Sequence, residues 1–130
     1  MSDTTPNTIE ARRTSAAPIT FELALYRVRD ADAFAGRQHE LHAAARGFDG
    51  YLGSWPLRAD GTSDVSDVFA DLVQWRDAEA ARAAAEQFGW RPDLAWAGQA
   101  MTEMLFFGHL HTHDGHPTAS TDPIVATDPT

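Results

Sequence analysis

The hydrophobic pattern near the middle of the chain changes from that of a strand to that of a helix. Residues 68–75 read VFADLVQW and are rich in the branched, aliphatic and aromatic side chains that suit a pleated sheet. Asp77 follows as a helix-capping residue, and Ala80, Ala84 and Phe88 then recur on one helical stripe. A strand that leads without a loop into an amphipathic helix predicts half of a split βαβ unit.

The same periodicities predict elements in the order βαββαβ. The other strands are expected at residues 19–28, 51–58 and 101–111. Asp30 or Asp32 caps the first helix, which runs to about Arg46, and a short helical turn is expected near Pro92. This order is that of a ferredoxin-like α+β fold, a four-stranded antiparallel sheet with two helices on one face.

The two ends of the chain differ in composition from its centre. Residues 1–18 are rich in Thr, Ser, Pro and Ala, and residues 112–130 place prolines among Thr, Ser and Asp. Neither segment has a hydrophobic period, so both are predicted to be disordered, as an N-terminal arm and a C-terminal tail. The folded domain is therefore expected to span residues 19–111.

The first and last predicted strands are apolar at most positions instead of alternating. A sheet with one face in water alternates cleanly, so both faces of this sheet are expected to be covered. The two predicted helices cover only one face. A second copy of the same sheet is the simplest cover for the other face, which predicts a homodimer.

Composition and charge exclude several functions. Asp and Glu total 19 against 10 Lys and Arg, a formal net charge of −9. Nucleic acids and anionic membranes bind basic faces, so neither is an expected partner. Cysteine is absent, which excludes disulfides, thiol catalysis and zinc–thiolate sites. No apolar run approaches the ~20 residues of a membrane span, and no signal segment is evident, so we expect a cytoplasmic protein.

Three carboxylates fall inside predicted strands: Glu22, Asp71 and Glu103. Strands disfavour Asp, and ionised carboxylates are seldom buried without a partner. The first strand of this fold lies between the third and the fourth, so the three side chains approach one another if they share a face. Close like charges raise at least one pKa and create a general acid or base near neutral pH. Pairing with Arg27 or Arg76, or exposure to solvent, is the alternative.

The histidines form two groups. His39 and His42 lie three residues apart on the first predicted helix, where they are candidates to hold a base over a pocket. His109 and His111 alternate along the last strand and project to one side, ~7 Å apart. With Glu22 they form a candidate site for zinc, iron or copper. Solvated surface histidines are the alternative in both groups.

Aromatic side chains are the candidates for binding a flat ligand. Tyr26, Trp75 and Trp96 are among those that could line a pocket between sheet and helices. Packing in the core or in a dimer interface is the alternative. The chain has no GxGxxG motif, phosphate loop or GxSxG turn, so Rossmann-type nicotinamide binding, ATP hydrolysis and serine hydrolase chemistry are not expected.

The strand–helix junction DLVQWRDAEA at residues 71–80 is accompanied by GFDGY at 47–51 and ELALY at 22–26. Together these motifs resemble the dimeric α+β barrel superfamily, and in particular the antibiotic biosynthesis monooxygenases. That superfamily also includes haem-degrading enzymes, lactone isomerases and stress proteins, so the fold does not fix the function. Its haem-degrading members bind iron through a histidine on the second helix. No histidine lies between Ala43 and Gly108, so haem degradation is not expected.

The resemblance implies a small monooxygenase-like or cyclase-like enzyme that acts on a planar aromatic, polyketide-type substrate. Asp71 or Glu22 would remove a proton, and His42 would assist its transfer. The residues that contact the substrate would be Trp75, Tyr26, His39 and Trp96. No cofactor is implied, although a metal or an externally supplied flavin stays open.

Two other functions fit the same residues. One is a non-catalytic ligand-binding or stress-response dimer, in which the strand carboxylates are structural. The other is a metal-dependent enzyme with His109, His111 and Glu22 as ligands.

Overall fold

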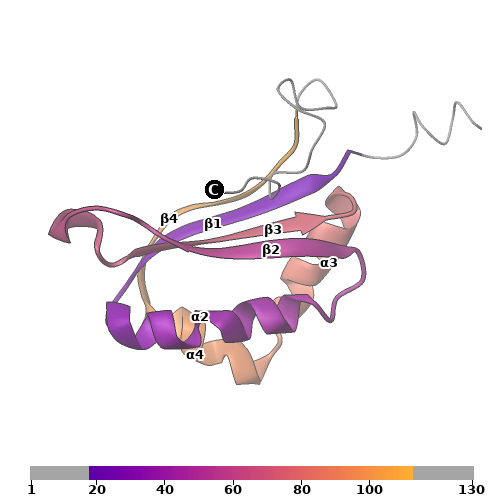
Figure 1. Cartoon of the computed structure of the whole chain (residues 1–130). Helices are drawn as coiled ribbons and strands as arrows, with labels where there is room; N and C mark the ends of the chain where they lie inside the picture. Colours follow the sequence, from indigo (N-terminus) through magenta and orange to yellow (C-terminus); the bar gives the residue numbers. More distant parts are fainter. Residues whose placement is uncertain (1–17, 113–130) are drawn as a thin grey trace, which may run out of the picture.

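The structure, a computed structural model, describes residues 18–112 and contains one four-stranded antiparallel sheet (Figure 1). The predicted arm and tail lie outside the described residues, apart from Pro18 and Thr112. The strands are β1 (Thr20–Val28), β2 (Tyr51–Arg58), β3 (Val68–Trp75) and β4 (Met101–Leu110). Their order in the sheet is β2-β3-β1-β4, so the expected position of the first strand between the third and the fourth is confirmed.

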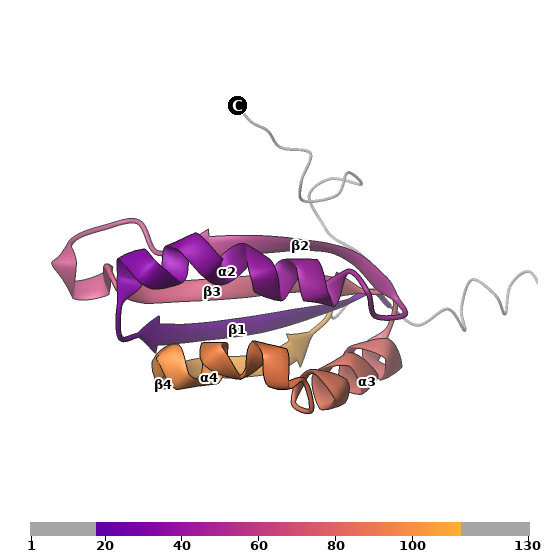
Figure 2. The ribbon, with the colours of Figure 1, turned by 90° about the horizontal axis from the view of Figure 1, so that it is seen from below.

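Three α-helices cover one face of the sheet (Figure 2). They are α2 (Ala31–Ala45), α3 (Ala78–Phe88) and α4 (Ala95–Ala100), with 3₁₀ turns at η1 (Ser63–Val65) and η2 (Pro92–Leu94). The ferredoxin-like α+β fold is confirmed, but the expectation of two helices is corrected by α4. Its six residues, AWAGQA, are too few to give a clear helical period in the sequence. No helix among residues 18–112 has the length and apolar character to cross a membrane.

Side-chain caps begin the two longer helices where the sequence predicted them. The Asp30 carboxylate accepts a hydrogen bond from the backbone nitrogen of Ala33 at 3.1 Å. The Asp77 carboxylate accepts one from the backbone nitrogen of Ala80 at 2.8 Å. Each cap satisfies a backbone donor that the first helical turn leaves free, so each fixes where its helix leaves the sheet.

The alternation of β1 assigns its residues to two faces. Glu22, Ala24, Tyr26 and Val28 face the helices, while Phe21, Leu23 and Leu25 face the opposite side. On the helix side, Tyr26, Phe34 and Phe69 form the centre of the core and pack edge to face, with ring centroids 5.6 and 4.9 Å apart. A second cluster surrounds Trp75 under α3.

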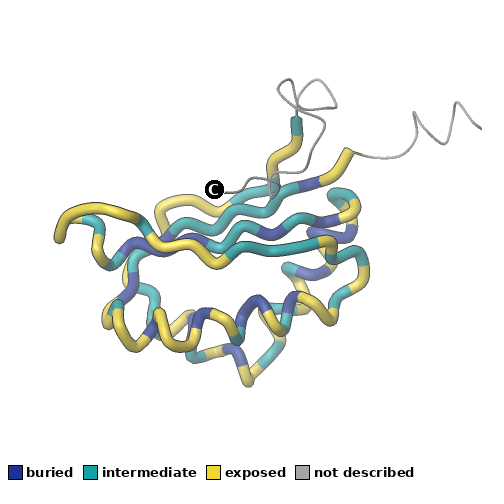
Figure 3. Tube along the Cα trace, viewed as in Figure 1, coloured by how far each residue is buried: buried dark blue, intermediate teal, exposed yellow. Residues whose placement is uncertain are grey.

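No element among residues 18–112 covers the opposite face of the sheet (Figure 3), and the register places apolar residues on it. Pairing across the strands brings together Leu23 with Leu72, and Leu25 with Ala70 and Phe106. Further residues that the register places on this face are Phe21, Trp55, Leu57 and Leu110. We call this set the open sheet face.

Gly50 marks the tightest turn, where the chain enters β2. Its φ is +90°, and an added Cβ would lie 2.5 Å from the Cβ of Ala80 on α3. Its carbonyl also accepts a hydrogen bond from the Arg76 backbone nitrogen at 2.8 Å. A side chain here would therefore strain the backbone and push α3 away from the sheet.

We expect Gly50→Ala to lower the free energy of unfolding by about 1–3 kcal/mol, because it combines an unfavourable φ with overpacking. Gly36→Ala is the matched control. Gly36 lies within α2 with nothing within 4 Å of its added Cβ, so that change should stabilise by about 0.5–1 kcal/mol. Urea titration measures both. Equal stability of Gly50→Ala and the unmodified protein would contradict this account of the turn.

Candidate functional site

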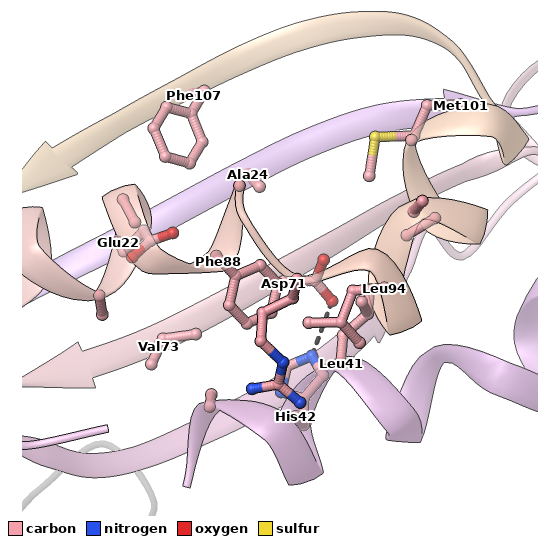
Figure 4. A pocket seen from close by; sticks show the side chains of 18 of the residues that line it. Glu22, Ala24, Leu41, His42, Asp71, Val73, Phe88, Leu94, Met101 and Phe107 are labelled. Atoms are coloured by element: carbon pink, nitrogen blue, oxygen red, sulfur yellow. Dashed lines mark hydrogen bonds and ion pairs between the residues drawn. The ribbon is translucent and has the colours of Figure 1, made fainter. Parts of the chain in front are cut away.

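A cavity of about 650 Å³ lies between the helix-facing side of the sheet and the helices α2, α3 and α4 (Figure 4). The sheet contributes the carboxylates Glu22 and Asp71 and apolar side chains around them. On the helical side Leu41, Phe88 and Leu94 line the cavity together with several small residues, namely Ala84, Ala85, Ala95, Ala97 and Gly98. Short side chains on these helices leave the space that larger ones would fill.

Asp71, on β3, is held by three donors. Its Oδ2 accepts the Tyr26 hydroxyl at 2.5 Å, and its Oδ1 lies 2.9 Å from Gln38 Nε2 and 2.7 Å from His42 Nε2. Gln38 and His42 are four residues apart on α2 and are both buried, so they reach the carboxylate from one helical face. The candidate residues Asp71 and His42 are thus brought together, with Tyr26 behind them.

The Asp71 cluster keeps Tyr26 protonated. Burial raises the pKa of the Tyr26 phenol, and the charge of Asp71 and the hydrogen bond to it raise that pKa further. The hydroxyl is therefore a fixed donor to Asp71. His42 Nδ1 is buried with no hydrogen-bond partner among the described residues, which leaves Nε2 as the nitrogen that contacts the carboxylate.

Glu22, on β1, forms a second polar centre at the cavity. Its Oε1 accepts the indole N–H of Trp75 at 3.0 Å and lies 3.6 Å from His109 Nε2, too far for a hydrogen bond. Burial raises the pKa of Glu22. His109 and the Trp75 N–H oppose that shift, while the charge of Asp71 adds to it.

The two carboxylates share the cavity because their strands are paired in register. Ala24 is the β1 partner of Asp71, and Glu22 lies two residues further along the same face of β1. Both carboxylates line the cavity, whereas Tyr26 is fully buried and does not. A ligand in the cavity would therefore reach Glu22, Asp71 and Trp75, but not the tyrosine ring.

Glu103 does not join the other strand carboxylates. It pairs with Arg27 across the sheet, with its Oε1 3.7 Å from the guanidinium, and Arg27 also binds Asp67 at 2.7 Å. The register of β1 against β4 shifts between Leu25 and Tyr26, and this shift places Glu103 on the face away from the cavity. The expectation that Glu22, Asp71 and Glu103 converge is therefore corrected. Of the three, Glu22 and Asp71 line the cavity.

Three predicted substrate-contacting residues lie outside the cavity lining. His39 is exposed on the outer side of α2, next to Arg37 and Glu40, which pair with each other. Trp96 packs against Phe34 and under the Arg37 guanidinium, 4.0 Å from the ring centroid. Tyr26 donates to Asp71 and does not line the cavity. Of the predicted substrate-contacting set, Trp75 lines the cavity.

The predicted metal ligands are not assembled. His109 approaches Glu22, but His111 follows the end of β4, is exposed, and has Nδ1 3.1 Å from the Thr112 carbonyl oxygen. Among the residues that the structure describes, no three His, Asp or Glu side chains are grouped closely enough to hold a metal ion. The interpretation of His109, His111 and Glu22 as a ligand set is corrected accordingly.

Two residues near the carboxylates were not among the predicted site residues. Gln38 lies on the same face of α2 as Leu41 and Ala45, and its amide donates to Asp71. That face is buried, so a polar residue within it was a signal that could have identified Gln38. Arg91 lines the cavity mouth and binds Asp93 through two hydrogen bonds of 2.9 and 2.8 Å. No local pattern in the sequence marks it.

Solved structures share this fold. SnoaB, described as a cofactor-independent oxygenase from Streptomyces nogalater, matches with a TM-score of 0.61 and 18% identity, over 75% of this chain and 95% of its own. A proposed antibiotic biosynthesis monooxygenase from Bordetella bronchiseptica matches with a TM-score of 0.57 and 15% identity, over 73% and 97%. A second such protein, from Chloroflexus aurantiacus, matches with a TM-score of 0.53 and 14% identity, over 76% and 97%.

No protein-family model matches the chain, and no curated protein sequence matches it significantly. The structural matches span nearly the whole length of the compared chains at identities below 20%. They establish the fold, and the chemistry has to be inferred from the residues of the site. The predicted likeness to the antibiotic biosynthesis monooxygenases is confirmed at that level: the chain has the ferredoxin-like α+β fold of these structures.

Proposed function

We propose that the protein is a small monooxygenase-like enzyme that acts on a planar aromatic, polyketide-type substrate by acid–base chemistry. The observation that carries this proposal is Glu22, a carboxylate with a raised pKa that lines an apolar cavity. The likeness of the fold to SnoaB supports an oxygenase. The cavity volume of about 650 Å³ is in the range of small-molecule sites.

Glu22 is the proposed proton acceptor. Its Oε1 is held by the Trp75 indole, while no hydrogen bond within the described residues occupies Oε2. One carboxylate oxygen is thereby fixed and the other is available to a substrate, which suits a positioned general base. Trp75 also lines the cavity, so its ring would align a flat substrate against the same carboxylate.

Asp71 and His42 are proposed to complete the acid–base set in a different role. Asp71 already accepts from three donors, so its proposed role is to position His42 and not to receive the substrate proton. The carboxylate holds the His42 imidazole at the cavity wall through the 2.7 Å contact with Nε2. In the proposed reaction this pair balances the charge that develops when the substrate loses its proton.

The proposed reaction uses dioxygen as the oxidant. Glu22 removes one proton from an acidic CH₂ group between two aromatic rings, which leaves a delocalised carbanion. The carbanion is oxidised by O₂ and forms a carbon–oxygen bond to a peroxide, which takes up a proton. Loss of the second C–H proton and cleavage of the O–O bond release water and leave a carbonyl group. One oxygen atom enters the product and the other enters water.

This sequence needs no protein-bound cofactor, because the electrons come from the substrate itself. The description of SnoaB as cofactor-independent supports that choice. A cyclase-like reaction would use the same proton abstraction without O₂, and a flavin or metal supplied from outside would replace the direct reaction of the carbanion with oxygen.

A non-catalytic ligand-binding or stress-response role is the second candidate. The complete hydrogen bonding of Asp71 favours it, because a carboxylate with three donors serves structure as well as chemistry. The two functions differ in one respect. An enzyme turns over an aromatic ligand in a manner that depends on Glu22, whereas a binding protein holds the ligand unchanged.

We expect Glu22→Gln to lower kcat for a tricyclic hydroxyaromatic with an acidic CH₂ group by about 10²-fold or more, because it removes the general base. The unmodified protein should gain activity as pH rises through an inflection above 4.5, the ordinary pKa of the group, and the variant should lack that inflection. Oxygen consumption and product absorbance measure both quantities. Glu86→Gln is the matched control, since this exposed carboxylate on α3 does not line the cavity.

A stability measurement checks the same carboxylate without any substrate. The raised pKa means that the folded state binds the Glu22 proton more tightly than the unfolded state. The unmodified protein should therefore lose stability relative to Glu22→Gln as pH rises from about 4.5 through the folded-state pKa. Full activity in Glu22→Gln would refute the role of this base. Ligand binding without turnover by the unmodified protein would favour the second candidate.

We also infer that the protein is a homodimer formed through the open sheet face. This face carries aliphatic and aromatic side chains from all four strands, including Leu57, Phe106 and Leu110, each more than 40% exposed. A contiguous apolar surface of this kind is rare on a soluble monomer. One face of a single sheet can pack on the same face of a second copy related by a two-fold axis.

The oligomeric state tests this inference directly. The unmodified protein should have twice the 14.2 kDa chain mass by sedimentation or light scattering at micromolar concentration. Leu72→Arg, at the centre of the open sheet face opposite Leu23, should shift the protein to monomer by burying an unpaired charge in the interface. Ala35→Arg, on the exposed side of α2, is the control and should stay dimeric. A monomeric unmodified protein would overturn the inference.

A further inference from the structure

Three large apolar side chains line the cavity and yet remain exposed. They are Trp90, with 81% of its surface exposed, and Met104 and Phe107, each 49% exposed. Trp90 lies in the segment between α3 and η2, and the other two lie on β4. A residue that is both part of the lining and open to solvent marks the mouth, so this mouth has an apolar rim.

The backbone on either side of Trp90 is fixed. The Trp90 nitrogen donates to the Gln87 carbonyl at 3.0 Å, and the Arg91 nitrogen donates to that of Phe88 at 3.2 Å. Arg91 is held in turn by its two hydrogen bonds to Asp93. The indole is therefore presented from a rigid support and does not extend from a loose loop.

The indole of Trp90 itself has no partner that explains its position. Within residues 18–112 no aromatic ring or guanidinium stacks on it, unlike Trp75, which packs against Tyr51, and Trp96, which packs under Arg37. A tryptophan exposed to this degree lacks the favourable free energy that burial of its large apolar surface would contribute. Because its support is rigid and it stands at the cavity mouth, a ligand that extends out of the cavity would restore that burial.

The remaining cavity wall defines the shape of such a ligand. The small residues of α3 and α4 leave a slot beneath the rim, with Glu22 and Trp75 on the sheet side. Glu22 and Trp90 both line the cavity, so a ligand that contacts both must extend from the sheet side to the mouth. A larger fused-ring system meets this condition more readily than a small one.

We propose that Trp90 is a specificity-determining residue that stacks on the outer ring of a polycyclic aromatic ligand. The inference rests on the proposed aromatic-binding cavity and adds the size class of the ligand. Stacking of one ring on another contributes enough to discriminate ligands that reach Trp90 from those that do not, by about 3- to 10-fold in affinity.

The test is a calorimetric titration of the full chain with a series of neutral hydroxyaromatics of two, three and four fused rings. Trp90→Ala should weaken binding of the three- and four-ring members by about 3- to 10-fold and leave the two-ring member within about twofold. Trp90→Phe should retain most of the affinity, since it keeps a stacking ring. Gln87→Ala is the control: its side chain is exposed and does not line this cavity, and its carbonyl bond to Trp90 is unchanged.

A fluorescence measurement gives an independent readout. Quenching of the solvent-exposed tryptophan emission by the four-ring ligand should be present in the unmodified protein and reduced in Trp90→Phe, with quenching of buried Trp75 retained. An equal loss of affinity for all ring sizes in Trp90→Ala, or no loss, would overturn the proposal. A change in oligomeric state without a change in ligand affinity would also overturn it, by assigning Trp90 to a protein contact.

The outcomes separate this proposal from the proposed function. Size-dependent binding without turnover would support the role of Trp90 and count against the enzyme. If turnover depends on Glu22 but ligand binding does not depend on Trp90, the enzyme proposal would be supported and the role of Trp90 overturned. Failure of every ring size to bind the unmodified protein would overturn both.

Discussion

The buried carboxylate of Asp71 sets the distance between α2 and the sheet. A charge with only 14% of its side chain exposed is stable only when it is compensated, and three donors compensate it. One donor comes from β1 and two come from α2, so the carboxylate joins β3 to both of these elements. Because Gln38 and His42 must both reach the same oxygen, the helix is held in one rotation about its axis.

Gln38 extends this constraint across the sheet. Its Nε2 also lies 3.0 Å from the Ala70 carbonyl oxygen on β3 and 3.3 Å from that of Leu57 on β2, so one amide shares its two hydrogens among three acceptors. These polar contacts hold α2 firmly against the sheet. On the other side, α3 and α4 present small residues to the cavity, and a rigid α2 cannot shift to fill that space. The cavity is thus a consequence of one polar cluster and one alanine-rich wall.

The sequence predicted those features that depend on neighbouring residues. The caps at Asp30 and Asp77 and the order of the elements came from local signals, and His42 was among the predicted site residues. Partners distant in the chain could not be predicted. The contact between Glu22 and the indole of Trp75 joins residues 53 apart, and no local pattern encodes it.

The prediction that Glu103 would join the other two carboxylates was wrong because of an irregularity in the pairing of β1 with β4. Leu25 pairs with Phe106, and an unbroken register from that pair would set Glu103 opposite Val28, on the cavity side. The irregularity after Leu25 shifts β4 by one residue and sets Glu103 opposite Arg27 instead. A one-residue shift exchanges the two faces of a strand, and hydrophobic periodicity alone does not reveal a bulge.

The alternation of β1 couples the cavity to the open sheet face. Glu22 faces the cavity, while its neighbours Phe21 and Leu23 face the other side. The buried helix-facing side chains of β1 specify its register, because a slip of one residue would turn Tyr26 out of the core and Glu22 away from Trp75 and Asp71. A second copy packed on Phe21 and Leu23 would oppose that slip, because the slip would bury a carboxylate in an apolar interface. Dimer formation and the geometry of the acid–base site would then depend on the same hydrogen-bond register.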